Sequence, residues 1–118
     1  TLNIKLTGEM SYDNAGLGIA GGCDFNGDGE KDFIVGARGE NSETGAVYIR
    51  YGPVNSSSSL STANVKLTGE TIGDYVGASI ANVDLNSDGL CDIIISAYLA
   101  DYTVSTAGRV YVIYGLGY

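Results

Sequence analysis

Residues 24–32 read Asp-Phe-Asn-Gly-Asp-Gly-Glu-Lys-Asp, and residues 84–92 return to the same pattern as Asp-Leu-Asn-Ser-Asp-Gly-Leu-Cys-Asp. Each stretch has oxygen-bearing side chains at positions 1, 3, 5 and 9 and a glycine at position 6. This spacing suits a hard cation such as Ca²⁺, which takes about six to eight oxygen ligands. Asp, Asn and Gly also favour plain hairpin turns. Because three carboxylates in one short loop repel each other without a cation, two copies in register predict two cation loops.

The EF-hand loop begins in the same way, but it closes with an acid at position 12 and lies between helices. Position 12 is Val35 or Ile95 here, each inside an apolar run, so the loops are expected to join strands. The missing acid also argues against a dockerin-type module. Mg²⁺ fits less well than Ca²⁺ because it demands octahedral geometry and few protein ligands. We therefore expect two Ca²⁺ ions per chain, bound by Asp24, Asn26, Asp28, Glu30 and Asp32 and by Asp84, Asn86, Asp88, Leu90 and Asp92, with Glu30 and Leu90 contributing only a backbone carbonyl.

Further matches show that the chain consists of two similar repeat units. The sequence Lys-Leu-Thr-Gly-Glu at residues 5–9 recurs at residues 66–70, and residues 46–52 match residues 109–115. The repeat unit is therefore about 60 residues long. We expect a single propeller segment over residues 1–118, with repeat 1 at about 1–55 and repeat 2 at about 56–118.

Within each unit, short apolar runs are bounded by Gly, Asn, Asp and Ser, and no helical periodicity is present. This pattern predicts an all-β fold with four-stranded antiparallel sheets, one propeller blade per unit. The strands are expected at 2–6, 17–23, 32–37 and 46–51, and then at 65–68, 78–83, 92–97 and 110–114. The serine-rich segment 53–62 is expected to be a flexible surface connection. The glycosylation-type triplet at Asn55 is expected to be an unmodified polar loop.

Composition narrows the chemistry. The 118 residues suffice for one domain, and the apolar runs are too short to cross a bilayer, so no membrane insertion is expected. The absence of histidine excludes His-based triads and His-zinc sites within this chain. A net charge of −8 argues against nucleic-acid binding and favours a cationic partner. Cys23 and Cys91 are too few for a disulfide scaffold, and the sequence leaves open whether they are bridged or free.

Each unit resembles an FG-GAP repeat, the blade sequence of the integrin alpha-subunit β-propeller, over nearly the whole chain. The signature Phe-Gly and Gly-Ala-Pro motifs are degraded, so the calcium loop and the strand at 45–52 carry the specific part of the likeness. The degraded motifs stand as Ala15-Gly16, Val76-Gly77, Gly36-Ala37-Arg38 and Ser96-Ala97-Tyr98. The resemblance implies calcium-stabilised extracellular or cell-surface blades that act in adhesion. It also implies that the Lys-Leu-Thr-Gly-Glu strand is the outermost strand of the preceding blade.

Two blades cannot close a propeller, which needs at least about four. We expect the N-terminal strand to complete the open blade of another copy, so that a trimer or tetramer closes a ring of six or eight blades. Two alternatives to the ring stay open. In the first, the chain is a piece of a larger propeller. In the second, its two blades pack face to face as a small sandwich.

Three functions follow from the sequence. The first is a non-catalytic adhesion or recognition module that binds a protein, or a glycan as a lectin does, through loops 38–44 and 98–107. Tyr98 and Tyr102 offer aromatic surface there, although packing in the core or between blades is the favoured role of any one tyrosine. The second is a purely structural fragment with no ligand of its own. The third is an enzyme that uses Glu9 with Asp13, or Glu70 with Asp74, as acid and base. Duplication of architecture explains these paired acids better than duplicated active sites do.

Overall fold

The computed structural model describes residues 3–100 and 107–116, and these form an almost wholly β fold. The elements in chain order are β1 (Leu6–Thr7), β2 (Ala15–Cys23), β3 (Asp32–Ala37), α1 (Glu40–Glu43), β4 (Ala46–Arg50), β5 (Ser58–Ser59), the 3₁₀ turn η1 (Leu60–Thr62), β6 (Val65–Thr68), β7 (Ile80–Val83), β8 (Asp92–Ala97) and β9 (Arg109–Ile113). The single α1 turn is irregular, because Asn41 and Ser42 within it have left-handed backbone angles. The all-β prediction is confirmed.

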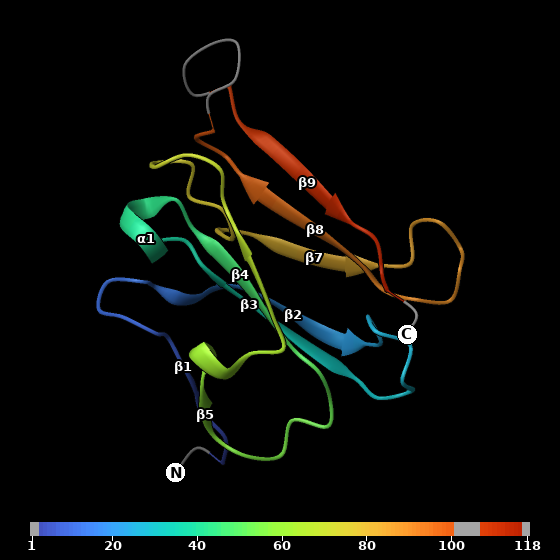
Figure 1. The fold of residues 1–118 in the computed structure, drawn as a ribbon. Helices are drawn as coiled ribbons and strands as arrows, with labels where there is room; N and C mark the ends of the chain where they lie inside the picture. The colour runs from blue at the N-terminus through green and yellow to red at the C-terminus, as the bar shows by residue number, and fades with distance from the viewer. Residues whose placement is uncertain (1–2, 101–106, 117–118) are drawn as a thin grey trace.

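The strands form two antiparallel blades that lie side by side (Figure 1). Blade 1 has the order β2-β3-β4-β6, and blade 2 has the order β7-β8-β9. Strand β6 contains the start of the second Lys-Leu-Thr-Gly-Glu segment, and it closes blade 1 beside β4, as the family resemblance implied. Blade 2 has three strands within the described residues, because no later described segment pairs with β9, and this agrees with the open second blade expected from the sequence. Strand β1 pairs in parallel with β5 of the same chain, with Leu6 opposite Ser58.

The core lies between the blades because alternate residues of a strand point to opposite faces. Ile34, Val47 and Ile49 of blade 1 point toward blade 2 and are at most 1% exposed. They pack with Ile93 and Ile95, which blade 2 turns toward blade 1. The opposite face of blade 1 forms a second cluster around Val35 and Tyr48. Both faces of the strongly apolar strand β3 are therefore buried.

Two motif glycines bring the backbones of the two blades close together. Gly77 has a φ of 90°, which favours glycine, and its carbonyl lies against the Cα of Gly36. A Cβ atom on Gly36 would overlap the carbonyl oxygen of Gly77. The glycines of the degraded Phe-Gly and Gly-Ala-Pro motifs therefore set how near the blades approach.

The equivalent face of blade 2 is uncovered in the described structure. Val110, Val112 and Tyr114 correspond to Val47, Ile49 and Tyr51 of blade 1, and they are 64%, 43% and 55% exposed. We call Val110, Val112 and Tyr114 the open face.

The prediction that segment 53–62 is a plain flexible connection is wrong. The segment contains β5 and η1, and Leu60 is 1% exposed within the cluster around Val35 and Tyr48. The side chain of Ser59 caps η1 by accepting the Ser61 N–H at 3.1 Å. One apolar residue among the serines therefore anchors the segment, while Asn55 stays exposed.

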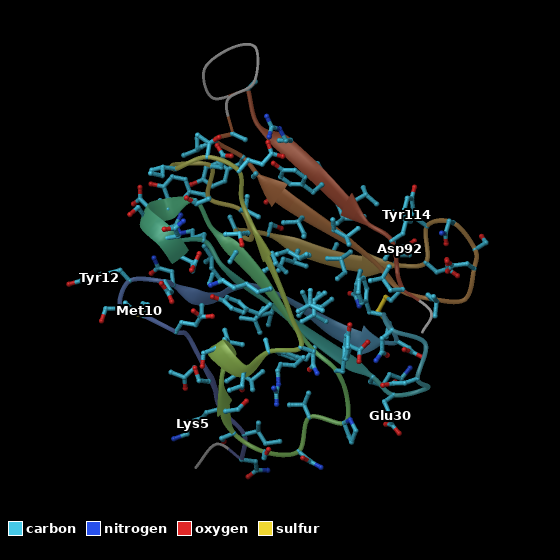
Figure 2. The ribbon with its side chains drawn as sticks, viewed as in Figure 1. Lys5, Met10, Tyr12, Glu30, Asp92 and Tyr114 are labelled. Carbon is cyan, nitrogen blue, oxygen red and sulfur yellow. A yellow bond between two sulfur atoms is a disulfide. The ribbon has the colours of Figure 1, made fainter. Side chains whose placement is uncertain are left out.

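The two cysteines form a disulfide, which resolves the question that the sequence left open. Cys23 ends β2 and Cys91 precedes β8, so the bond joins blade 1 to blade 2 with a Cα–Cα distance of 5.8 Å. Figure 2 shows it as a yellow bond between the two loop regions.

Candidate metal centre

The two predicted loops lie at the same end of the molecule (Figure 1). Residues 24–31 connect β2 to β3, and residues 84–91 connect β7 to β8. Each loop therefore joins the first two strands of a blade, as the apolar residue at position 12 predicted. Both loops are flanked by strands, so the exclusion of an EF-hand is confirmed.

Acid-to-amide hydrogen bonds shape the first loop. The Asp24 carboxylate accepts the N–H of Gly27 through Oδ1 at 2.7 Å and that of Gly29 through Oδ2 at 2.8 Å. Asp28 Oδ1 accepts the N–H of Glu30 at 2.8 Å. The alternating acids thus turn the backbone around their own side chains.

The second loop repeats this arrangement. Asp84 Oδ2 accepts the Gly89 N–H at 2.9 Å, and Asp88 Oδ1 accepts the Leu90 N–H at 2.9 Å. Ser87 stands where the first loop has Gly27, and both are left-handed, with φ of 61° and 81°. The two loops therefore follow the same path although their sequences differ at this position.

The aspartates at position 9 have a structural role that the sequence did not predict. Asp32 is 2% exposed, and its carboxylate accepts the N–H of Phe25 at 2.6 Å and that of Gly52 at 2.9 Å. Asp92 is fully buried and accepts the N–H of Leu85 and of Gly115, both at 2.8 Å. Each acid therefore ties the start of its loop to the end of the third strand. The only signal for this role is a glycine that follows both third strands.

The pKa of Asp28 is lowered from its ordinary value, first because its carboxylate accepts the Glu30 N–H and then because it accepts the Asn26 amide. Asn26 Nδ2 donates to Asp28 Oδ2 at 3.0 Å. Asp28 is therefore anionic at neutral pH, as a calcium ligand must be.

The structure places the predicted ligands on one loop in each blade but does not draw their carboxylates to one point. Within residues 3–100 and 107–116, no three His, Cys, Asp or Glu side chains gather as a metal site would require. Glu30 is exposed, and its side chain lies on the outer edge of its loop (Figure 2), which fits a contribution from its backbone alone. The donor set consists only of oxygen atoms, and in each loop all of the donors except the buried Asp32 and Asp92 are open to water or partly so. This set suits Ca²⁺.

The paired acids considered for catalysis have structural partners in both repeats. Buried Asp13 accepts the Met10 N–H at 2.7 Å, and buried Asp74 accepts the Thr71 N–H at 3.2 Å. Their companions form ion pairs instead, Glu9 with Lys66 at 3.3 Å and Glu70 with Arg109 at 2.9 Å. Both repeats therefore use the two acids in the same way: the aspartate fixes a turn, and the glutamate forms an ion pair with a lysine or arginine side chain.

The tyrosine predicted for recognition takes part in contacts between the blades. The Tyr98 ring lies 6.0 Å from the Tyr75 ring, and its hydroxyl accepts a hydrogen bond from Arg38 of blade 1 at 3.4 Å. Tyr98 is still about half exposed. Tyr102 lies outside the described residues.

Sequence comparison identifies the repeats. The FG-GAP repeat family matches residues 15–49 and 76–113. The chain belongs to this family. Integrin alpha-5 of Xenopus laevis is 38% identical over 109 residues, covering 86% of the chain and 10% of that protein. Human integrin alpha-11 is 38% identical over 101 residues (80% of the chain, 8% of that protein), and integrin alpha-8 of Gallus gallus is 35% identical over 91 residues (75% and 8%).

The FG-GAP chain therefore spans about a tenth of the length of these relatives. Its two matched segments each begin in the first strand region of a blade and end at or near its third strand. In the part of the chain that the structure describes, no helix is long and apolar enough to span a membrane.

Proposed function

We propose that this chain is a calcium-binding, non-catalytic segment of an adhesion or recognition propeller that works outside the cell or at its surface. Each loop would hold one Ca²⁺ through five residues: the side chains at positions 1, 3, 5 and 9 and the backbone carbonyl at position 7. These are Asp24, Asn26, Asp28, Asp32 and Glu30 in the first loop, and Asp84, Asn86, Asp88, Asp92 and Leu90 in the second. One observation carries the proposal. Two loops with the same donors fold through the same hydrogen bonds at the same hairpin of each blade.

A bound Ca²⁺ supplies positive charge to a hairpin that otherwise holds four carboxylates (first loop) or three (second loop) close together in sequence. The chain itself prepares the hairpin. Asp32 and Asp92 anchor it to the third strand. The backbone amides at positions 6 and 7 hold the acids at positions 1 and 5 in place. The ion is therefore expected to stabilise the folded blades and not to take part in a reaction.

Thermal unfolding and calorimetry test the proposal. We expect the melting temperature to rise with calcium and fall with EDTA, because an ion that binds only the folded chain stabilises it by mass action. Asp28→Ala and Asp88→Ala should each reduce the calorimetric stoichiometry from two ions to one. Glu30→Ala is the matched control, since its exposed side chain is not required. Absence of binding heat together with identical melting curves in calcium and EDTA would refute calcium binding.

The open face supports a role in assembly. In blade 1, the equivalent residues Val47 and Ile49 are covered by blade 2. A further blade would cover Val110 and Val112 of blade 2 in the same way. On the other side, blade 1 has an apolar groove of about 400 Å³ beside Ile19 and Phe33. We propose that copies join head to tail through these two surfaces into a trimeric or tetrameric ring. Strand β1 must leave β5 if it completes a neighbour's blade.

Native mass spectrometry distinguishes this assembly from the alternative, in which the chain is a piece of a larger propeller. A trimer or tetramer supports the ring, and a folded monomer contradicts it. The external ligand is proposed to be a protein and not a glycan, because Tyr98 is already engaged by Tyr75 and Arg38. Binding on a glycan array in the presence of calcium would favour the lectin-like alternative.

A further inference from the structure

The disulfide is placed between the two cation loops. Cys23 directly precedes Asp24, which is position 1 of the first loop, and Cys91 directly precedes Asp92, which is position 9 of the second. The bond therefore fastens the first predicted ligand of one loop to the last predicted ligand of the other, across the boundary between the blades.

Hydrogen bonds reinforce the same junction. The Cys91 N–H donates to the carbonyl of Asp24 at 2.8 Å, and the Leu116 N–H donates to the carbonyl of Phe25 at 2.8 Å. The neighbouring Gly115 N–H donates to the buried carboxylate of Asp92. Successive amides after β9 therefore hold one residue from each loop.

The side chain of Phe25 belongs to this junction as well. Phe25 follows Asp24 and is 1% exposed in the core between the blades, whereas its counterpart Leu85 is 48% exposed. Asn82 of blade 2 also donates to the carbonyl of Gly21 at 3.1 Å, just before the first loop. The first loop is therefore fixed from outside by blade 2.

The repeats show that the bridge is not needed to form the loop itself. The position of Cys23 is filled by Val83 in the second unit, and the position of Cys91 is filled by Lys31 in the first. Both loops nevertheless share the hydrogen bonds that the amides at positions 6 and 7 donate to the acids at positions 1 and 5. The cysteines are an addition at the junction, and they connect the loops to each other.

We propose that the Cys23–Cys91 bridge positions the two cation loops as one coupled unit, so that an ion in one loop raises the affinity of the other. This inference rests on the proposed calcium binding. The physical reason is that the bridge and the Cys91 N–H bond hold the backbone of Asp24 next to the anchored end of the second loop, so an ion that orders one loop also restrains the other. The second ion then meets a loop whose conformational freedom is already reduced. The cysteines act as positioning residues and not as ligands.

Titration calorimetry of the full chain with calcium tests the coupling. In the bridged chain, Asp28→Ala should remove one ion and also weaken the remaining site in the second loop by roughly five-fold or more, the lower range of typical coupling. Asp88→Ala should weaken the first loop by the same factor, because coupling is reciprocal. In a Cys23→Val/Cys91→Ala background, either aspartate substitution should leave the remaining site unchanged. Valine is chosen because Val83 fills the same place in the other repeat.

The outcomes separate the two proposals. A bridge that only supports the fold would lower the melting temperature and leave the cross-effect of Asp28→Ala intact. An Asp28→Ala chain that loses one ion while the other binds with wild-type affinity overturns the coupling and leaves calcium binding standing. Absence of calcium binding in the wild type overturns both. If the cysteine variant does not fold, the reciprocal effects of Asp28→Ala and Asp88→Ala in the bridged chain decide the matter.

Discussion

Val47 in blade 1 and Val110 in blade 2 occupy the same place in their repeats, yet Val47 is completely buried and Val110 is 64% exposed. Phe25 and Leu85 differ in the same way, at 1% and 48%. The strands and loops that carry these residues are alike in both blades, so the local fold does not decide their burial. A neighbouring blade decides it. Each blade is therefore a complete hairpin framework with an incomplete core.

The largest expected effect comes from making blade 1 resemble blade 2 at the contact between the blades. Gly36 corresponds to Ser96, and a side chain at Gly36 would overlap the Gly77 carbonyl. We expect Gly36→Ser to destabilise the fold by about 3 kcal/mol, because the backbone of blade 2 must move away. Urea unfolding measures the effect, with Ser96→Ala as the control. A loss below about 0.5 kcal/mol would show that the blades do not approach as closely as described.

The second effect compares the two valines directly. Val47→Ala should cost about 2 kcal/mol through lost burial and a cavity, whereas Val110→Ala should change stability by less than about 0.5 kcal/mol in an isolated chain. Urea unfolding at low and high protein concentration provides the test. Equal losses at high concentration alone would mean that another copy covers the open face. Equal losses at every concentration would contradict the exposure of Val110.

The third effect concerns the tyrosine beneath the ion pairs of blade 1. Burial raises the pKa of Tyr48 to about 12, although the Lys66 ammonium lies 5.3 Å from its ring and acts in the opposite direction. The pKa of Lys66 is raised as well, chiefly by its hydrogen bond to Glu40. Because both pKa values are raised in the folded chain, the contribution of these two groups to the free energy of unfolding is fully present below pH 10. This contribution declines as the pH rises toward 12.

We therefore expect the free energy of unfolding to fall by about 1 kcal/mol from Tyr48 at pH 11, since the unfolded tyrosine ionises first. Urea unfolding across this pH range checks the decline, and Tyr48→Phe should make it shallower. A Tyr48→Phe chain with the same slope as the wild type would contradict the role assigned to this phenol.

Much of the fold was predictable because local chemistry specifies it. The bounds of β3, β6 and β8 agree with the prediction, since β3 and β8 each start at the aspartate that closes a loop and each continues as an apolar run. The resemblance to FG-GAP repeats also implied that β6 would complete blade 1. The strand bounds depend on residues that are neighbours in sequence, whereas the place of β6 followed from the family likeness.

The features that the sequence did not predict depend on the packing of distant segments. The disulfide requires Cys23 and Cys91 to meet, and only the contact between the blades brings them together. Leu60 gave no periodic signal among serines, yet it fills the core of blade 1. Asp32 was predicted as a ligand from its spacing alone. Its hydrogen bond to the Gly52 N–H depends on β4, which begins 14 residues later and ends shortly before Gly52, so nothing in the loop sequence indicated it.

The smallest expected effect compares Glu9 and Glu70, two acids at equivalent positions of the two repeats. The side chain of Glu9 is 24% exposed and shares Lys66 with Glu40, whereas that of Glu70 is 64% exposed beside Arg109. Glu70→Gln should cost at most about 0.5 kcal/mol, because water and salt screen an exposed pair. Glu9→Gln should cost more, since it leaves Lys66 with one carboxylate in a less exposed place. Urea unfolding at low and high salt measures both, and high salt should erase the effect at Glu70 first. If Glu70→Gln proved the costlier change, the exposed edge of blade 2 would have to be covered in solution. The difference in exposure between the two blades would then hold only for the isolated chain.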